Sequence, residues 1–377
     1  MLLKQNRKIE NTSKIAIVGC GIVGATIAYE LSQNPGLDIT VIEKSTPANG
    51  STGAALGVLM GVISHKKKGR AWRLREASLK RYATLIDELE EKTGIDIPVN
   101  ALGIFKLLFV GDDLAKWHKL KEFRASKGWN LEIGDRNYVR QQCPHLINDD
   151  IIGAVYSPQD RQIHPVKLTQ ALVAAATANG VEFQFGVTVE DFITELVAGK
   201  ELSTCKQIIT AKGKIEVEQL VISAGLGSTP LTQSLQQTVS IRPVIGQAIR
   251  FKLNKPLGNP DFQPVITGKD RHIVPLGNNE YWLGATVEFP TETGDSIAEP
   301  RLLDRVIQDT IDFCPEISNA DILESWIGKR PRPEGIAAPV IGNLSGYDNV
   351  ILATAHYRNG VLLAPATALE VGKILGY

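Results

Sequence analysis

The pattern of apolar and polar positions predicts that the chain opens with a strand, a turn, a helix and a second strand. Residues 14–18 form a short apolar run typical of a buried strand, and residues 25–32 continue with helical character. Asn34-Pro35-Gly36 stops this helix, and residues 38–43 are the next strand. This order indicates an α/β unit.

The rest of the chain mixes further helices with two kinds of strand. Amphipathic or alanine-rich patterns predict helices at 71–92, 112–127, 166–179, 298–313 and 362–375. Single strands are predicted at 103–110, 181–185, 219–223 and 349–353, with a hairpin at 206–217. Residues 239–288 alternate in short apolar runs separated by turn residues, which predicts an antiparallel sheet.

A chain of 377 residues exceeds the size that one hydrophobic core usually supports, so we expect two domains. The fold class is predicted as α/β (α+β), with a Rossmann-like domain and an antiparallel-sheet substrate domain that are discontinuous in sequence. The Rossmann-like domain takes residues 13–92, 151–238 and 330–377. The substrate domain takes residues 93–150 and 239–329.

Composition excludes several classes of partner. Lys+Arg and Asp+Glu balance at 41 each, so nucleic acid is not expected. The four cysteines show no metal-ligand spacing, and we expect reduced thiols, no metal and a cytoplasmic protein. Residues 1–13 lack a secretory core and are expected to be a disordered lead, and no apolar run is long enough to span a membrane.

A glycine-rich motif between the first strand and the first helix predicts a dinucleotide site. Gly19, Gly21 and Gly24, with Ile22 and Val23 between them, follow a strand and open a helix. The first glycine permits the tight turn, the second lets backbone approach a pyrophosphate, and the third allows close helix–strand packing. The helix N-terminus then faces the phosphate charge.

An acidic residue ends the second strand where a carboxylate accepts hydrogen bonds from ribose hydroxyls. This residue is Glu43, followed by Lys44. A run of small residues then lets backbone come close to a bulky group, which favours FAD and leaves NAD as the alternative. The cofactor-contacting positions predicted in this run are Ser51, Thr52, Ala54, Ala55 and Gly57.

These motifs, together with the C-terminal run HYRNGVLLAPAT at residues 356–367, resemble the D-amino-acid oxidase superfamily of FAD-dependent oxidoreductases, and within it the glycine oxidases. The resemblance covers nearly the whole chain. It implies non-covalent FAD whose ring lies between the Rossmann-like domain and an antiparallel substrate sheet. Further cofactor contacts implied by it are Val189, Ala224, Gly225, Arg358, Asn359, Gly360, Val361 and Leu362.

The resemblance also implies catalytic residues. The segment WIGKRP at residues 326–331 matches a family segment whose arginine pairs with the substrate carboxylate, which assigns Arg330 to that role. A planar guanidinium grips a carboxylate with two hydrogen bonds. Arg358 lies beside the flavin ring. His272 stands where glycine oxidases carry a tyrosine, and it would make substrate binding sensitive to pH near neutrality or serve a structural role.

The implied reaction is oxidation of the Cα–N bond of glycine, sarcosine or a D-amino acid, by hydride transfer from Cα to flavin N5 with dioxygen as acceptor. One alternative is a dehydrogenase of D-amino or 2-hydroxy acids that passes electrons to a quinone or carrier, with peripheral membrane association. Another is an FAD-binding protein without turnover. Val287 replaces a longer family side chain, which opens the site to larger amines, and a homo-oligomer stays open.

Overall fold

The computed structural model describes residues 13–291 and 296–377. The disordered lead expected for residues 1–13 lies, apart from Ser13, outside the described residues. Within the described ranges, no helix is both long and apolar enough to cross a membrane.

A six-stranded sheet carries the N-terminal βαβ unit. Its order is β19-β20-β13-β1-β2-β9, and all neighbouring pairs are parallel except β19 with β20. The strands are β1 (Ser13–Val18), β2 (Leu37–Glu43), β9 (Glu182–Phe185), β13 (Gln219–Ile222), β19 (Val340–Asn343) and β20 (Val350–Thr354). The central strands β1, β13 and β20 are buried on both faces, which explains their mostly apolar sequences.

Alternate residues of β1 enter two different cores. Ile15 and Ile17 pack with the helices on one face, whereas Ala16 and Val18 pack with a β-meander on the other. The helices are α1 (Ile22–Leu31), α2 (Gly69–Thr93), α5 (Pro165–Ala178) and α8 (Gly360–Leu375). The opposite face is covered by β10 (Val189–Leu196), β11 (Ser203–Thr210), β12 (Gly213–Glu216), η1 (Gly225–Gly227) and α6 (Ser228–Ser234).

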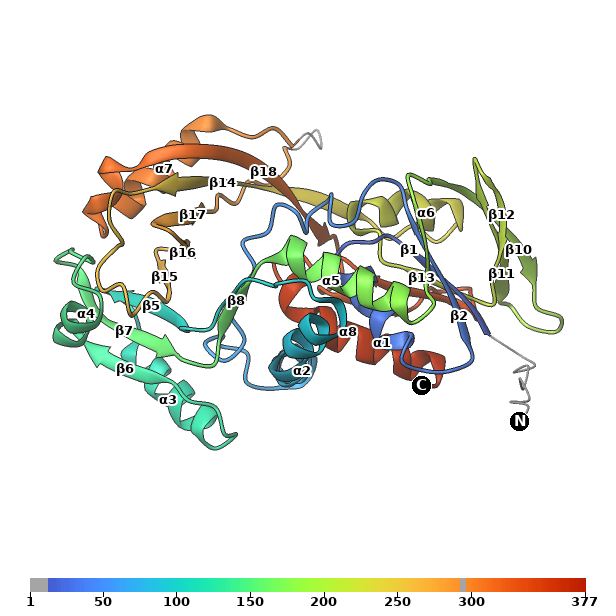
Figure 1. Cartoon of the computed structure of the whole chain (residues 1–377). Helices are drawn as coiled ribbons and strands as arrows, with labels where there is room; N and C mark the ends of the chain where they lie inside the picture. The colour runs from blue at the N-terminus through green and yellow to red at the C-terminus, as the bar shows by residue number, and fades with distance from the viewer. Residues whose placement is uncertain (1–12, 292–295) are drawn as a thin grey trace, which may run out of the picture.

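The second large sheet has eight strands in the order β18-β14-β17-β16-β15-β5-β7-β6 and is antiparallel except between β15 and β5. Its strands are β5 (Ile104–Phe109), β6 (Glu132–Asp135), β7 (Ile151–Ser157), β14 (Ile241–Lys252), β15 (Val265–Gly268), β16 (Arg271–Gly277), β17 (Glu280–Gly284) and β18 (Asp321–Pro333). Around it lie α3 (Leu114–Ala125), α4 (Arg136–Gln142), α7 (Pro300–Ile311) and η2 (Pro315–Asn319). The long strands β14 and β18 run from the α7 end toward the six-stranded sheet (Figure 1).

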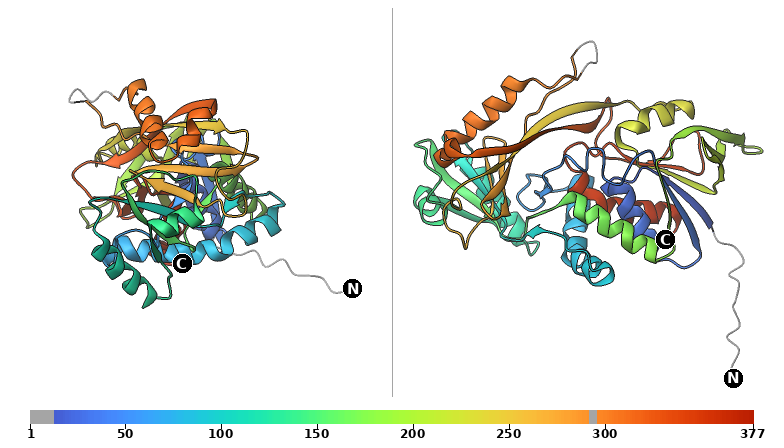
Figure 2. Two further views of the ribbon diagram at one scale, coloured as in Figure 1. Left: turned by 90° about the vertical axis from the view of Figure 1, so that its left-hand side faces the viewer. Right: turned by 45° about the horizontal axis from the view of Figure 1, so that its top comes forward.

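The two large sheets occupy opposite ends of an elongated molecule (Figure 2). A small sheet, in the order β3-β8-β4, lies in the crossing segments, with β3 at Val58–Leu59, β8 at Arg161–Ile163 and β4 at Val99–Asn100. The mixed α/β class with one parallel and one antiparallel sheet is therefore confirmed. The division into domains stays a prediction. Strand β7 pairs in the eight-stranded sheet, so the change of sheet lies after Ser157 rather than at residue 151.

Candidate functional site

The glycine motif shapes the turn between β1 and α1. Gly19 has φ +103°, and a Cβ there would lie 2.8 Å from the Cα of Ala224, so the turn packs closely against the end of β13. The third glycine, Gly24, lies in the first turn of α1, where a Cβ would be 2.0 Å from the carbonyl oxygen of Gly19. Gly24 thus serves packing, while Gly19, Gly21, Ile22 and Val23 line a cavity.

Glu43 is fixed at the end of β2. Its Oε2 accepts a hydrogen bond from the backbone N–H of Cys20 at 2.8 Å, and its Oε1 accepts one from the backbone N–H of Ser45 at 3.0 Å. Each carboxylate oxygen keeps a second lone pair for another donor. Glu43 and Lys44 both line the cavity.

The small-residue loop after β2 connects the start of α1 to strand β18. Thr52 Oγ1 accepts a hydrogen bond from the backbone N–H of Ile22 at 3.0 Å, and Ser51 Oγ donates to the carbonyl oxygen of Lys329 at 2.6 Å. Trp326 Nε1 donates to the carbonyl oxygen of Ala54 at 3.1 Å. The loop therefore brings Ser51, Thr52, Ala54, Ala55 and Gly57 to the cavity in a fixed position.

The N-terminus of α8 opens onto the same cavity. Gly360, Val361 and Leu362 line it, together with Arg358 from the preceding turn. The backbone N–H groups of a first helical turn have no partner within the helix and carry partial positive charge. Asn359 does not line the cavity, and its Oδ1 accepts a hydrogen bond from Nη2 of Arg75 at 3.3 Å.

Arg330 enters the cavity from β18. Its Nη1 donates to the carbonyl oxygen of Ile245 at 2.8 Å, and its guanidinium lies over Gly246, where a Cβ would be only 2.2 Å from Nη2. Burial, followed by the charge of Arg358, lowers the pKa of Arg330. The remaining guanidinium donors are available to an anion inside the cavity.

His272 lies on β16 and also lines the cavity. Its Nδ1 shares a hydrogen bond of 3.0 Å with Thr267 Oγ1. Burial, and after it the charge of Arg358, lowers the pKa of His272 to about 4. The expected pH sensitivity near neutrality is therefore wrong, because this imidazole is neutral there.

Most of the predicted site residues converge on one cavity of about 600 Å³ that both large sheets border. The exceptions are Gly24, Asn359 and Val189, the last of which begins β10 and pairs with Thr210 in the meander. The cavity has further lining residues that the sequence did not assign to the site, although several stand in the quoted segments 326–331 and 356–367. They are Ser45, Asn49, Gly50, Leu56, Val58, Ser223, Leu226, Gly227, Gly246, Ala248, Ala285, Ile327, Gly328, Lys329, Pro331, Ala353, Thr354, Ala355, His356 and Tyr357. Many of these residues are small and adjoin predicted site residues in the sequence. Their small size and position are a signal that could have indicated them.

The cavity and its surroundings offer neither a metal centre nor a thiol. No group of three or more His, Cys, Asp or Glu residues in the described ranges is placed to hold a metal ion. All four cysteines are buried, and none of them lines the cavity. Cys314 packs in the core of the eight-stranded sheet.

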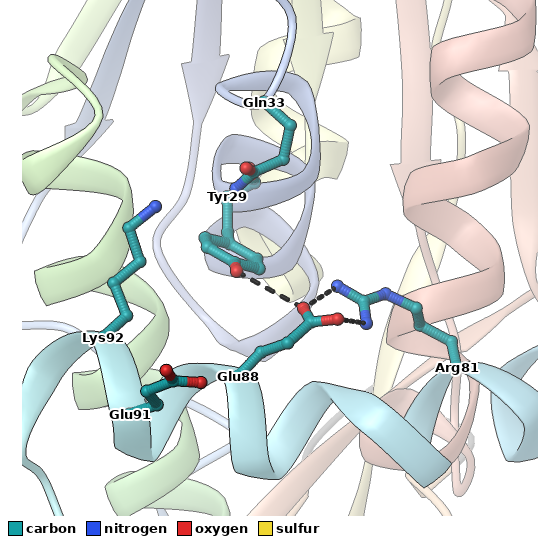
Figure 3. Close-up of a pocket in the computed structure, with 6 residues that line it drawn as sticks. All are labelled: Tyr29, Gln33, Arg81, Glu88, Glu91 and Lys92. Carbon is teal, nitrogen blue, oxygen red and sulfur yellow. Dashed lines mark hydrogen bonds and ion pairs between the residues drawn. The ribbon is translucent and has the colours of Figure 1, made fainter.

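A separate surface hollow lies between α1 and α2 (Figure 3). Two of its charged residues, Arg81 and Glu88, form an ion pair. Arg81 Nη2 lies 2.6 Å from Glu88 Oε2, and Arg81 Nε lies 2.7 Å from Glu30 Oε1. The Tyr29 hydroxyl points to the same Glu88 carboxylate. This hollow is best explained as an ion-pair network that joins two helices.

Comparison with known proteins places the chain among flavoenzymes. A family model described as FAD dependent oxidoreductase matches residues 14–374. The chain is 27% identical to a glycine oxidase of Geobacillus kaustophilus over 363 residues, which cover 96% of this chain and 92% of the relative. It is 30% identical to the bifunctional protein ThiO/ThiG of Trichormus variabilis over 372 residues, but spans about half (53%) of that longer protein.

Solved structures show the same similarity. The crystal structure of glycine oxidase from Geobacillus kaustophilus has a TM-score of 0.83 and 27% identity, with coverage of 97% of this chain and 95% of that one. L-proline dehydrogenase from P. horikoshii has a TM-score of 0.82 at 21% identity. The match covers 98% of this chain and 95% of the dehydrogenase chain. At that identity the likeness shows the fold alone.

Proposed function

Because the chain belongs to the family of FAD dependent oxidoreductases, we propose that it oxidises the Cα–N bond of a small amino acid with dioxygen as electron acceptor. The relatives named glycine oxidase support an amino acid as substrate. The observation that carries the proposal is a single cavity that joins the glycine motif, the N-terminus of α8 and Arg330. Together they offer a nucleotide site and a carboxylate site side by side.

The residues present fit FAD. The N-terminus of α1 with Gly19 and Gly21 would hold the diphosphate, and Glu43 would accept from the ribose hydroxyls of the adenosine half. The loop from Ser51 to Gly57 would pass along the ribityl chain. The first turn of α8 would face the pyrimidine edge of the ring, where its free N–H groups favour negative charge. At these positions the cavity is lined mainly by small residues, which leave room for the cofactor.

When bound, FAD supplies the acceptor for a hydride from the substrate Cα, and dioxygen returns it to the oxidised form with release of hydrogen peroxide. The overall reaction converts amino acid, dioxygen and water into 2-oxo acid, ammonia and peroxide. Arg330 holds the substrate carboxylate with charge-assisted hydrogen bonds and so fixes the direction of the Cα–H bond. His272, neutral and tied to Thr267, contributes a polar contact without adding charge.

The test is anaerobic mixing of the purified holoenzyme with glycine, sarcosine and the D and L forms of small amino acids, followed by admission of air. We expect the flavin absorbance to bleach with an amino acid and to recover in air, with one peroxide formed per substrate oxidised. Bleaching without rapid recovery in air would replace dioxygen by a quinone or protein carrier. No bleaching by any amino acid would overturn the proposal and favour a 2-hydroxy acid or a role without turnover.

A further inference from the structure

The cavity face of the eight-stranded sheet carries a basic residue beyond His272. Lys106 on β5 pairs in register with Thr267 on β15, and Thr267 pairs with His272 on β16. Residues paired across neighbouring strands point to the same face of a sheet. The hydrogen bond between Thr267 and His272 agrees with this arrangement. Lys106 therefore lies on the face that borders the cavity, two strands beyond His272.

The row of paired residues Lys106, Thr267 and His272 continues across the sheet in the other direction with smaller side chains. His272 pairs with Gly284 on β17, and Gly284 pairs with Ala248 on β14. Ala248 lines the cavity, and Gly246, two positions along the same strand, lies under the guanidinium of Arg330. The row thus runs from small residues near Arg330 to polar and basic residues at its outer end. A bound molecule would meet one cation at each end.

The charge of Lys106 is only partly compensated by neighbouring carboxylates. Lys106 is half-buried, and it forms no hydrogen bond or ion pair within the described part of the chain. Burial lowers its pKa, while Asp112 and Asp270 act in the opposite direction. Both carboxylates are engaged elsewhere, since Asp112 Oδ2 accepts from the backbone N–H of Phe109 at 2.8 Å and Asp270 pairs with Arg358 at 3.3 Å. Burial outweighs these two carboxylates, so the half-buried cation favours an additional anionic ligand.

Arg358 adds a second cation at this end. It lines the cavity and, among the described residues, forms an ion pair with the exposed Asp270. The neutral state of His272 agrees with a surplus of positive charge, because after burial its pKa is lowered by Arg358, Lys106 and Arg330 together, against Asp270 alone. Arg330 is taken by the first carboxylate of the substrate, so Lys106 and Arg358 remain.

We propose that Lys106 and Arg358 form a second anion-binding end of the substrate site, and that the preferred substrate is a small amino acid carrying a second carboxylate. This inference rests on the proposed function, since Arg330 must hold the first carboxylate. It adds no chemical step, because the second carboxylate is bound and does not react. It makes Lys106 a specificity-determining residue that acts by direct contact with the distal carboxylate.

A further group of basic residues lies near Lys106. The loop that carries Lys66, Lys67 and Lys68 leads into α2, and the buried Arg124 holds it by donating to the carbonyl oxygens of Val62, Ser64 and Lys66 at 2.7 to 2.8 Å. The charges of Lys67 and Lys106 both lower the pKa of His65, after its burial and Lys116. Lys67 therefore adds positive charge in the neighbourhood of Lys106, and such a group of cations attracts acidic molecules.

The experiment compares aspartate with asparagine, which has the same shape but no side-chain charge. Both the D and the L enantiomers are tested, because the proposed function does not fix the configuration of the substrate. The readout is the ratio of kcat/KM for aspartate to that for asparagine, measured on the holoenzyme. We expect this ratio to exceed one in the wild type and to fall roughly 10-fold to 100-fold in Lys106→Gln, since one charge-assisted contact is lost. The matched control is Lys255→Gln, an exposed lysine in the β14–β15 loop, which should leave the ratio unchanged.

A wild-type ratio at or below one, or a ratio unchanged in Lys106→Gln, would overturn the inference while leaving the amino acid oxidase standing. Failure of every amino acid to reduce the flavin would instead overturn the proposed function. A second measurement uses the wild type alone, so it remains informative if Lys106→Gln folds poorly. In the wild type, succinate should perturb the flavin spectrum at a lower concentration than butyrate, and equal concentrations would contradict a second anion site.

Discussion

Arg330 can turn its guanidinium into the cavity because the neighbouring strand offers a residue without a side chain. Arg330 pairs with Val244, and Gly246 lies two positions further along β14, where the guanidinium rests. The hydrogen bond to the carbonyl oxygen of Ile245 orients the group in this position. The carboxylate site thus depends on one arginine and on one glycine that no motif indicates.

Gly246→Ala should therefore reproduce part of the effect of Arg330→Met. A Cβ at position 246 would lie 2.2 Å from Nη2, so the guanidinium must move. For Arg330→Met we expect the KM for the amino acid to rise about 10-fold or more, because a charge-assisted contact is lost. For Gly246→Ala we expect a smaller rise. Steady-state kinetics check both, and an unaltered flavin spectrum is the control. An unchanged KM in Arg330→Met would contradict the carboxylate role.

His272 should contribute no ionisation to catalysis near neutrality. Its pKa of about 4 lies below the ordinary histidine value, so the folded protein keeps it neutral from slightly acidic pH upward. The profile of kcat/KM between about pH 6 and 8 should thus have the same shape in the wild type and in His272→Gln. A step near pH 6.5 in the wild type that is missing in the variant would show that His272 is charged during the reaction.

The lowered pKa of His272 also predicts the direction in which the free energy of unfolding changes with pH. In the unfolded chain the imidazole takes up a proton below its ordinary pKa, whereas the folded chain resists protonation until about pH 4. The contribution of His272 to the free energy of unfolding is therefore present at neutral pH and is lost as the pH falls toward 4. His272→Gln should flatten this part of the acid denaturation curve.

At the scale of elements, helix α8 contains a proline that removes one of its own hydrogen bonds. Pro365 has no N–H, so the carbonyl oxygen of Val361 lacks its helical donor. The buried hydroxyl of Tyr82 on α2 donates to this oxygen at 2.6 Å. Helix α2 thus completes the first turn of α8, which faces the cavity.

Tyr82→Phe should cost about 1–3 kcal/mol in the free energy of unfolding, because the Val361 carbonyl becomes a buried acceptor without a donor. Urea unfolding of the apoprotein measures the loss. Pro365→Ala restores a backbone N–H to the helix, so the cost of Tyr82→Phe should shrink in the Pro365→Ala background. Equal costs in both backgrounds would show that the Tyr82 hydroxyl does not compensate for the proline.

Strands and helices with a local signal were predictable from the sequence, and β18 was not. The predicted strand at 38–43 and the helix at 71–92 correspond to β2 and α2 within a few residues. Strand β18 has thirteen residues, is rich in charge and contains Pro331 and Pro333, so no apolar alternation marks it. It is an edge strand whose position is fixed by long pairing with β14, a contact distant in sequence.

The site divides in the same way. The glycine turn, Glu43 and the α8 start were predictable because each motif is contiguous and its chemistry follows from backbone geometry. Gly246 was not, because it enters the site through the pairing of β14 with β18, two segments far apart in the chain. The position of Lys106 beside Thr267 likewise depends on sheet register between distant segments. Val189 was predicted as a cofactor contact, but it begins the meander and stays away from the cavity.

At the scale of the whole molecule, the formal net charge is zero, so any attraction for an acidic substrate must come from the local distribution of charge. The cavity lies where the two large sheets approach each other, and residues of both border it. Glu43 and Ala224 adjoin the six-stranded sheet, whereas His272 and Arg330 belong to the eight-stranded sheet. A cofactor that fills this cavity contacts both halves at once.

FAD should therefore stabilise the molecule as a unit. A ligand that binds only the folded state adds about 2.7 kcal/mol when its concentration is 100 times its Kd. The Tm of the apoprotein should rise with added FAD, and one transition should report both halves, because the cofactor links the two sheets. In Glu43→Gln the same rise should need more FAD, since a neutral amide is a weaker acceptor for ribose hydroxyls.

Scanning calorimetry at several FAD concentrations distinguishes the outcomes. If the two sheets formed independent units with FAD on only one of them, the thermogram would resolve two transitions, and only one would move with FAD. A single transition that moves as a whole shows that the two sheets unfold as one cooperative unit that FAD stabilises. Because Glu43 belongs to one sheet and Arg330 to the other, Glu43→Gln should shift this single transition, whereas Arg330→Met should shift it only in the presence of a substrate carboxylate.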